Sequence, residues 1–517
     1  MYAALKEDEE TSALAQADMA RIMISAKLDA DIRSKLGQFM TPAPVATFMA
    51  KRFTTLPKVV RLLDAGAGVG TLTAAFVNEA CLLRTPPEEI NVTAFEVDKT
   101  LSDLLEMTLM ACEAQCQVSG IDFKYEIIRD DYILHSAEPL ISQPSEGLKY
   151  NCAILNPPYA KINSKSNTRS ALRRIGIETS NLYTAFVAFA LLQLEQKGQM
   201  VAITPRSFCN GSYFEPFRHF MLECSALESV HLYESRRRAF SDDDVLQENI
   251  IFKLVKSEPQ PVTVRITSNS CPQDINMIVR DVPYGEVVHH DDSHSYIHLT
   301  VTEAGRDLAH KIITLPCSLR DLGINVSTGR VVDFRAKEHL RLNPDSDAVP
   351  LIYPCHFEQG YVSWPKKGGR KPNALASNAS TSDLMVPRGI YVLTKRFTSK
   401  EEKRRLVAVI FDPESVPGEL IGFENHLNYF HENGHGLTPD LALGLCLFLN
   451  SSAVDGYFRQ FSGHTQVNAT DLRNLRYPDR AQLERIGRGC GRVPTTQEAV
   501  DSIIETLLAE MKPQKSV

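Results

Sequence analysis

The sequence lacks any long apolar run: none approaches the roughly 18 residues that a membrane span requires. Its first ten residues, MYAALKEDEE, do not have the basic and then apolar pattern of a secretion signal. The eleven cysteines form no CxxC pair, and no His, Cys or Asp set has the spacing of metal ligands. These absences exclude a membrane role, a disulfide framework and a bound metal, and they favour a cytoplasmic protein with reduced thiols.

The sequence also lacks positive charge overall, with a net charge of −7 over 517 residues. That sum is unusual for a protein that binds nucleic acid, but phosphate contacts depend on where the charges lie. With 43% hydrophobic and 23% charged residues the composition is that of an ordinary globular chain. The length predicts two or three domains of roughly 100–200 residues each.

The hydrophobic patterns divide the chain into three parts. Residues 1–36 are expected to form an N-terminal helical segment. Between 59 and 255 short apolar runs alternate with helical patterns, which is typical of βαβ units and a mostly parallel sheet. Beyond about 260 the rhythm is lost and polar, turn-rich stretches appear. We therefore predict an α/β domain over 37–258 and an α+β domain over 259–517.

The first apolar run leads into the turn DAGAGVG at 64–70 and then into a helical pattern. Glycines at the carboxyl end of a strand let the backbone approach a nucleotide-like ligand. The second strand ends at Glu96, whose carboxylate can accept hydrogen bonds from both hydroxyls of a ribose. The third ends in DDY at 130–132, where a carboxylate can accept from an adenine amine, although Asp131 alone would indicate only a solvated turn. In this order the segments predict a cofactor site.

The fourth apolar strand ends in NPPY at 156–159. Prolines cannot donate hydrogen bonds, so this loop leaves its carbonyls free to accept. An adenine amine is a poor nucleophile because its lone pair is delocalised. Acceptors around its two hydrogens, here Asn156 Oδ1 and the Pro157 carbonyl, would favour the reactive form. Tyr159 can stack on a base that has left the duplex. The alternative is a stiff turn between a strand and a helix.

Taken together, GQFMTP at 37–42, DAGAGVG, FEVD, DDY and NPPY resemble the gamma-class (TaqI-type) adenine-N6 DNA methyltransferases of bacterial restriction-modification systems. The resemblance is strong over about 37–255. It implies a Rossmann-like methyltransferase domain with S-adenosyl-L-methionine as cofactor, followed by a target-recognition domain. It also implies double-stranded DNA as substrate and a restriction endonuclease as a functional partner that need not be bound.

The resemblance also assigns residues. The expected cofactor contacts are Thr41, Pro42, Asp64, Ala65, Gly66, Glu96, Asp131 and Asn156. The expected contacts to the target base are Asn156, Pro157, Tyr159 and, on a looser match, Phe240.

Two basic regions are candidate DNA contacts. Lys161, Lys165 and Arg169 follow NPPY and suit phosphates, although a solvated helix start has the same pattern. Within 361–405 eleven Lys or Arg stand against three Asp or Glu, a local net charge of +8. In the glycine-rich turn of that region the expected phosphate contacts are Lys366, Lys367, Arg370 and Lys371. Gln466 and Asn468 can read base edges, although a polar loop before a helix is nearly as good an explanation.

Two alternatives stay open. A methyltransferase of RNA or of a protein glutamine would present a similar planar group to NPPY. A DNA-specificity module without catalysis would keep the fold as a scaffold. The long second half favours a polymer substrate, and the presence of Glu96, Asp131 and Asn156 together disfavours an inactive module.

Overall fold

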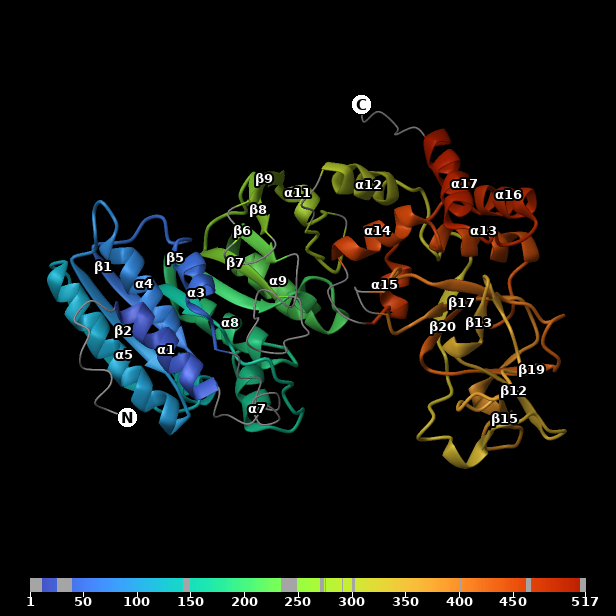
Figure 1. The fold of residues 1–517 in the computed structure, drawn as a ribbon, viewed down its shortest axis with the longest axis horizontal. Coiled ribbons are helices and arrows are strands. Elements are labelled where there is room, and N and C mark those ends of the chain that lie inside the picture. The colour runs from blue at the N-terminus through green and yellow to red at the C-terminus, as the bar shows by residue number, and fades with distance from the viewer. Residues whose placement is uncertain are drawn as a thin grey trace. The chain divides into compact units, whose positions relative to one another are not determined.

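The structure is a computed structural model that describes residues 12–25, 40–142, 149–233, 249–269, 274, 276–290, 292–299, 303–398, 402–461 and 466–511 (Figure 1). Phe240 therefore lies outside the described residues. The chain divides into two compact units, Met1–Val301 and Thr302–Val517. In the described part of the chain no single helix is both long and apolar enough to cross a membrane. The pair α13 (Pro439–Leu449) and α14 (Ser452–Phe461), bent by 55°, passes by length and composition alone.

The first unit is built on a nine-stranded sheet of order β3-β2-β1-β4-β5-β7-β6-β8-β9. Its strands are β1 (Val59–Ala65), β2 (Glu89–Phe95), β3 (Asp122–Ile128), β4 (Tyr150–Leu155), β5 (Leu194–Pro205), β6 (Ser225–Tyr233), β7 (Asn249–Lys256), β8 (Thr263–Asn269) and β9 (Ile278–Pro283). Strands β3, β2, β1, β4 and β5 pair in parallel, whereas β7 is antiparallel to both of its neighbours. The predicted α/β architecture with a mostly parallel sheet is confirmed.

Helices cover both faces of this sheet. They are α1 (Ala13–Ser25), α3 (Ala43–Ala50), α4 (Thr71–Cys81), α5 (Lys99–Val118), α6 (Tyr132–Ser142), α7 (Asn167–Arg174), α8 (Leu182–Gln193), α9 (Glu215–Cys224) and α11 (Tyr284–Val287). Figure 1 shows α1, α4 and α5 gathered over β1 and β2 and α3 next to β5, and the buried side chains of these four helices belong to one core. The second core includes side chains of α6, α8 and α9. Neighbouring residues of β1 divide between the cores, Leu62 into the first and Leu63 into the second, because strand side chains alternate between faces.

The unit boundary lies later than the sequence patterns predicted. Strand β8 pairs in parallel with β6, from Ser229 opposite Arg265 to Tyr233 opposite Asn269, and β9 pairs with β8. These strands extend the sheet beyond 258, so the residues up to Val301 belong to the first unit. Helix α1 also belongs to it rather than to a separate segment, because Ala13 and Ala17 are buried in the core shared with α4 and α5.

The second unit is α+β, as predicted. One sheet has the order β10-β20-β17-β18-β14-β13 and the other β11-β15-β12-β19-β16. The strands are β10 (Asn325–Thr328), β11 (Leu340–Arg341), β12 (Ala348–Ile352), β13 (Phe357–Glu358), β14 (Tyr361–Val362), β15 (Ala374–Ala376), β16 (Met385–Pro387), β17 (Tyr391–Lys395), β18 (Ala408–Phe411), β19 (Leu420–Phe423) and β20 (Leu427–His431). The helices are α12 (Glu303–Ile313), α13 (Pro439–Leu449), α14 (Ser452–Phe461), α15 (Ala469–Arg473), α16 (Arg480–Cys490) and α17 (Gln497–Glu510). Helix α13 is buried along its length and carries much of this unit's core.

Candidate active site and nucleic-acid contacts

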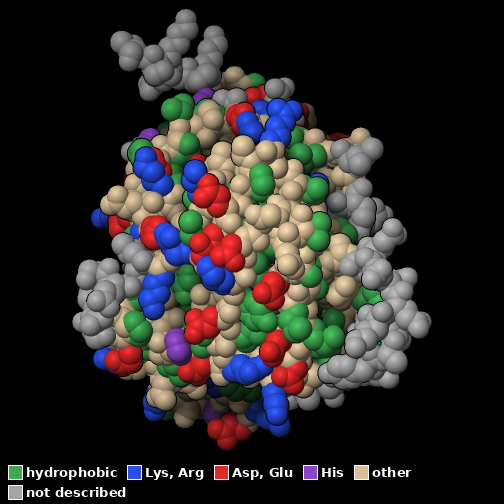
Figure 2. All heavy atoms as spheres, turned by 90° about the vertical axis from the view of Figure 1, so that its left-hand side faces the viewer, with side chains coloured by type: hydrophobic (Ala, Val, Ile, Leu, Met, Phe, Trp, Pro, Cys, Tyr) green, Lys and Arg blue, Asp and Glu red, His purple; other side chains and the backbone are tan. Residues whose placement is uncertain are grey.

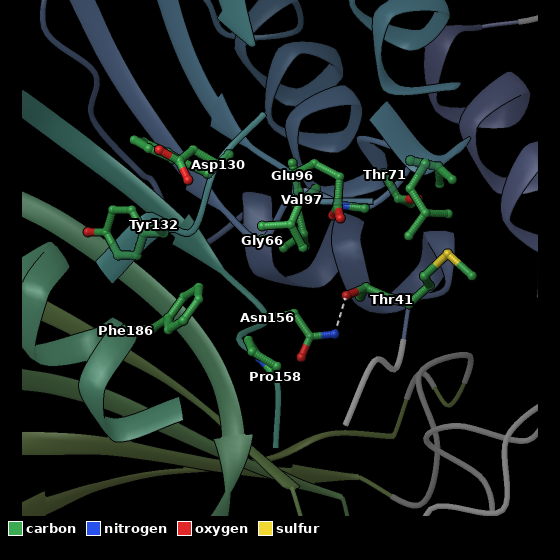
Figure 3. A pocket seen from close by; sticks show the side chains of 17 residues that line it. Thr41, Gly66, Thr71, Glu96, Val97, Asp130, Tyr132, Asn156, Pro158 and Phe186 are labelled. Atoms are coloured by element: carbon green, nitrogen blue, oxygen red, sulfur yellow. Dashed lines mark hydrogen bonds between the residues drawn. The ribbon is translucent and has the colours of Figure 1, made fainter. Parts of the chain in front are cut away.

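A pocket lies where the parallel strands of the first unit end (Figure 3). The turns after β1, β2, β3 and β4 all contribute to it, as does the segment that precedes α3. Its lining residues are Met40, Thr41, Gly66, Ala67, Gly68, Val69, Thr71, Leu72, Phe95, Glu96, Val97, Leu101, Asp130, Tyr132, Asn156, Pro158 and Phe186. The structure thus brings together Thr41, Gly66, Glu96 and Asn156, four residues that the sequence assigned to one site.

The glycine turn forms one wall of the pocket. Gly66 has a φ of +78°, and a side chain there would project toward the ring of Phe186, 3.7 Å from the position of its Cβ. Asp64 and Ala65 lie beneath this turn and do not line the pocket. Asp64 is fully buried, accepts a hydrogen bond from Thr73 Oγ1 at 2.7 Å, and has its pKa raised by burial to about 7. The buried Asp64 side chain therefore stabilises the glycine turn through its hydrogen bond to Thr73.

Glu96 is held in place by the backbone. Its Oε2 accepts the Gly68 N–H and its Oε1 accepts the Asp98 N–H, both at 2.9 Å. The side chain is 6% exposed, and burial raises the pKa of Glu96 although these two hydrogen bonds oppose the shift. Each carboxylate oxygen can accept further bonds. The arrangement therefore suits a ligand with two adjacent hydroxyls, such as a ribose.

The two aspartates after β3 face different ways. Asp130 lines the pocket, whereas Asp131 accepts the Leu134 N–H at 2.9 Å and caps the start of α6. The sequence assigned the adenine contact to Asp131, but the side chain at the pocket is that of Asp130. The neighbouring Tyr132 lines the pocket too, and its hydroxyl donates to Gln193 at 2.6 Å.

The NPPY loop places an amide at the pocket. Asn156 Nδ2 donates to Thr41 Oγ1 at 2.9 Å, and Asn156 Oδ1 accepts from the Tyr159 hydroxyl at 3.1 Å. Pro157 is buried and Pro158 lines the pocket. The segment after the loop is pinned to the start of α8, because the Leu182 N–H donates to the Ala160 carbonyl at 2.9 Å.

Aromatic side chains surround this loop. The ring of Tyr159 lies edge-on to Tyr183, with centroids 6.1 Å apart, and burial raises the pKa of both phenols. Phe186 from α8 closes the pocket from another side (Figure 3). The sequence analysis missed Phe186 because α8 is apolar on every face, so the pattern does not distinguish a ring at the pocket from a core ring.

Of the cations that follow NPPY, Lys161 and Lys165 are exposed. The side chain of Arg169 is only 13% exposed and forms an ion pair with Glu178. Elsewhere in this unit, exposed basic and acidic side chains form ion pairs, for example Lys58 with Glu88. The face shown in Figure 2 accordingly presents basic and acidic side chains interspersed. Lys161 and Lys165 are therefore the better candidates for phosphate contacts.

In the second unit the predicted phosphate contacts divide in the same way. Lys366 Nζ donates to the Cys355 carbonyl at 2.9 Å, and Lys371 Nζ lies 2.8 Å from Asp333 Oδ2. All four residues are exposed, including Lys367 and Arg370. Two of the four cations in this turn thus have their charged groups engaged within the protein.

Three separate segments meet where β17 and β20 approach α15. Phe397 is 42% exposed, its ring centroid lies 4.7 Å from that of His426, and it forms an isolated β-bridge with Gln466. Arg396 places its guanidinium 5.6 Å from the Phe397 ring centroid. Asn468, in contrast, is the N-cap of α15 in a capping box with Asp471. We call Arg396, Phe397, His426 and Gln466 the Phe397 patch.

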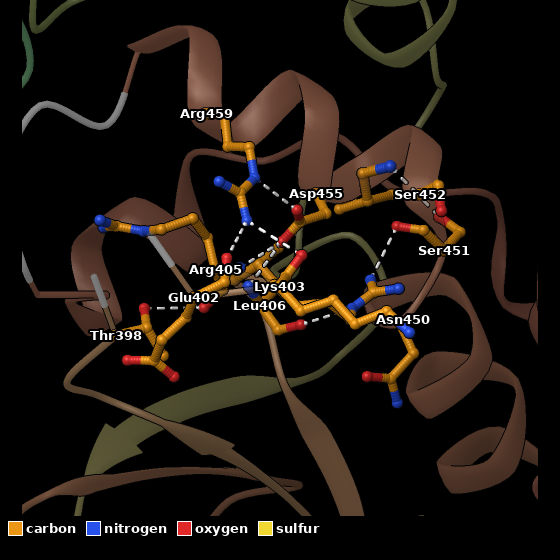
Figure 4. A network of polar contacts seen from close by, with 12 residues as sticks. Thr398, Glu402, Lys403, Arg405, Leu406, Asn450, Ser451, Ser452, Asp455 and Arg459 are labelled. Carbon is orange, nitrogen blue, oxygen red and sulfur yellow. Dashed lines mark hydrogen bonds and ion pairs between the residues drawn. The ribbon is translucent and has the colours of Figure 1, made fainter. Parts of the chain in front are cut away.

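A polar network fixes the chain next to this patch (Figure 4). Asp455 accepts the Arg405 and Leu406 N–H groups at 2.7 and 2.8 Å and the Arg459 Nε–H at 2.7 Å. The Thr398 hydroxyl donates to the Arg405 carbonyl at 2.9 Å. These bonds join Thr398, which is next to Phe397, to residues 405–406 and, through Asp455, to α14.

Comparisons with known proteins find restriction-modification methyltransferases. A family profile described as Eco57I restriction-modification methylase matches residues 81–240. The Type II methyltransferase M.PstI of Providencia stuartii is 47% identical over 96% of this chain and 97% of its own. The Type II methyltransferase M.BsuBI of Bacillus subtilis is 41% identical over 96% and 98%. The cryo-EM structure of a DrdV–DNA complex shares the fold, with a TM-score of 0.51 at 13% identity over 94% of this chain and 60% of that one.

Proposed function

Because the chain belongs to the Type II DNA methyltransferases of restriction-modification systems, we propose that it methylates the N6 amine of adenine. The observation that carries this proposal is the amide of Asn156 at the pocket, followed by two prolines and an aromatic residue. A planar amine with two hydrogens fits acceptors at this position. The 5-carbon of a cytosine carries no amine hydrogens that the amide oxygen could accept.

The cofactor is S-adenosyl-L-methionine, and the lining residues fit it. The glycine turn leaves space beside Phe186, and the Glu96 carboxylate can accept the ribose hydroxyls. We assign the adenine contact of the cofactor to Asp130, since Asp130 lines the pocket and Asp131, which caps α6, does not. Thr41 and Asn156 line the same pocket and are hydrogen-bonded to each other. When bound, the cofactor supplies an electrophilic methyl group.

The protein's own residues then prepare the amine. Asn156 Oδ1 and the Pro157 carbonyl accept its two hydrogens, which directs the nitrogen lone pair toward the methyl group. Transfer would form the new N–C bond at the expense of the sulfur–methyl bond of the cofactor, and the amine would release one of these hydrogens to water as a proton. The target base must be turned out of the duplex to reach the pocket, and Tyr159 supplies a ring on which it can stack. We keep Phe240 as a second stacking residue on the resemblance alone.

Nucleoside analysis tests the reaction. Duplex DNA is incubated with the protein and methyl-labelled S-adenosyl-L-methionine and is then digested, and we expect the label in N6-methyladenine. Asn156→Ala should lose nearly all turnover, while calorimetry should give an unchanged affinity for the cofactor. Label in a cytosine product, in RNA or in a protein glutamine would contradict the proposal. Turnover of Asn156→Ala within about tenfold of wild type would contradict the role of the amide.

We propose that the second unit recognises the DNA target, with phosphate contacts at Lys367 and Arg370 and base contacts at the Phe397 patch. An exposed aromatic ring flanked by Arg396 and Gln466 offers both stacking and hydrogen bonding to base edges. Binding to duplexes at several salt concentrations separates the roles. The salt slope is the slope of the logarithm of the DNA-binding constant against the logarithm of the salt concentration. Arg370→Ala should reduce its magnitude by about one unit for every DNA sequence. Lys371→Ala is the matched control, because that cation already pairs with Asp333.

Gln466→Ala should instead relax the preference at one base pair by about 1–3 kcal/mol and leave the salt slope unchanged. Asn468 was predicted to read a base as well, but as an N-cap it contributes to the stability of α15. We therefore expect Asn468→Ala to lower the melting temperature more than it changes sequence preference. A change in the salt slope for Gln466→Ala without a change in preference would invert this division of roles.

A further inference from the structure

The side-chain amide of Asn156 is held at both ends. Its nitrogen donates to Thr41 Oγ1 at 2.9 Å, and its oxygen accepts from the Tyr159 hydroxyl at 3.1 Å (Figure 3 shows the first bond). An amide is nearly symmetric in shape but not in hydrogen bonding, since one end donates and the other accepts. If the amide were rotated by half a turn, its NH2 group would face the target amine, donor against donor. The reaction therefore depends on which end faces the substrate.

Thr41 is itself placed by the N-terminal part of the chain. It is 4% exposed and immediately precedes Pro42, the N-cap residue of α3. The first N–H of that helix, on Ala43, donates to Asp18 Oδ1 of α1 at 3.1 Å. The same oxygen accepts from Arg21 Nε at 2.7 Å, and Arg21 is 3% exposed although it lies on a helix near the chain's N-terminus. A chain of short contacts thus runs from α1 to the NPPY loop.

We propose that Thr41 is a positioning residue that orients the Asn156 amide, with its oxygen toward the target amine, and that Asp18 of α1 holds Thr41 in place. This inference rests on the proposed function, because it requires an amine as the group that is methylated. It also differs from the role that the sequence resemblance assigned to Thr41, which was a contact to the cofactor. Both roles place Thr41 at the pocket, but they predict different kinetics.

The decisive variants are Thr41→Val and Thr41→Ser. Valine keeps the shape and removes the acceptor, whereas serine keeps a hydroxyl. We expect Thr41→Val to slow methylation at saturating S-adenosyl-L-methionine by roughly tenfold or more, with the cofactor Kd within about twofold of wild type. Thr41→Ser should recover most of the lost rate. A merely structural role would not produce this recovery together with an unchanged Kd.

The second comparison uses α1. Asp18→Ala should slow methylation in the same direction but less, because it loosens Thr41 without removing its hydroxyl. Met23→Ala is the matched control, since that side chain is on the same helix and is 43% exposed. If Thr41→Val fails to fold, Asp18→Ala decides: a slower rate at saturating cofactor supports the proposal and a wild-type rate overturns it.

Two results would overturn the proposal outright. One is a wild-type rate for folded Thr41→Val. The other is a loss that saturating cofactor fully restores, which would make Thr41 a cofactor contact only. Failure of the proposed function would look different, because wild-type protein would then yield no N6-methyladenine whatever the behaviour of the Thr41 variants.

Discussion

Replacing Glu96 by Gln should weaken cofactor binding far more than it weakens the fold. The carboxylate presents two acceptor oxygens, each of which already takes one backbone N–H at 2.9 Å. Glutamine has one acceptor oxygen, and its NH2 group would face the other N–H. A hydrogen bond to a charged group contributes about 1.5–3 kcal/mol, so the loss of one ribose contact should raise the Kd for S-adenosyl-L-methionine roughly 10- to 150-fold.

The stability of the free protein should fall by less than this. Burial raises the pKa of Glu96, which means that the charged form is disfavoured at this place, and a neutral side chain relieves that cost. Isothermal titration calorimetry gives the Kd, and thermal denaturation without ligand gives the stability. The control is Glu88→Gln, which replaces an exposed carboxylate that is paired with the exposed Lys58. If folded Glu96→Gln binds the cofactor within about threefold of wild type, the assignment of the ribose contact is wrong.

Two further predictions concern neighbouring residues with different roles. Asp130→Asn should weaken cofactor binding, which calorimetry measures. Asp131→Ala should leave cofactor binding unchanged and lower the free energy of unfolding by about 0.5–2 kcal/mol in urea denaturation, because α6 loses its cap. The reverse pattern would restore the sequence-based assignment to Asp131. Gly487→Ala should lower the free energy of unfolding by about 3 kcal/mol or more in urea denaturation, because its Cβ would lie 1.9 Å from the Asp440 carbonyl oxygen. Gly489 lies in the same helix, and a Cβ there would have no atom within 4 Å, so Gly489→Ala should be neutral or stabilising by up to about 1 kcal/mol. Equal effects of the two glycine substitutions would contradict the close packing of α13 and α16.

The sequence was sufficient to predict the catalytic unit because its signals are local. Alternating apolar runs and helical patterns indicate βαβ units, and the carboxyl ends of parallel strands meet at one edge of a sheet. Motifs that follow β1, β2 and β4 must therefore converge, and Gly66, Glu96 and Asn156 do line one pocket. The relatives then show the family, but the role of each residue remains a prediction to be tested.

The end of the first unit was harder to predict. Strands β8 and β9 join the sheet through pairing with β6 and with each other, and hydrogen bonding between strands distant in sequence leaves no local pattern. The choice between Asp130 and Asp131 has a similar origin. Adjacent residues in a turn point in different directions, and the backbone conformation that decides between them depends on how α6 begins.

The distribution of charge and of side-chain partners was decided only by the tertiary structure. Charge counts predicted DNA contacts at Arg169 and Lys371, yet folding pairs them with Glu178 and Asp333. Likewise Thr41 and Asn156 are 115 residues apart, and their hydrogen bond exists only because the fold brings the segment that precedes α3 to the turn after β4. A motif specifies which chemical groups are present and on which strand end they stand. Which of these groups face the substrate, and which form hydrogen bonds or ion pairs with one another, depends on contacts between segments that meet only when the chain folds.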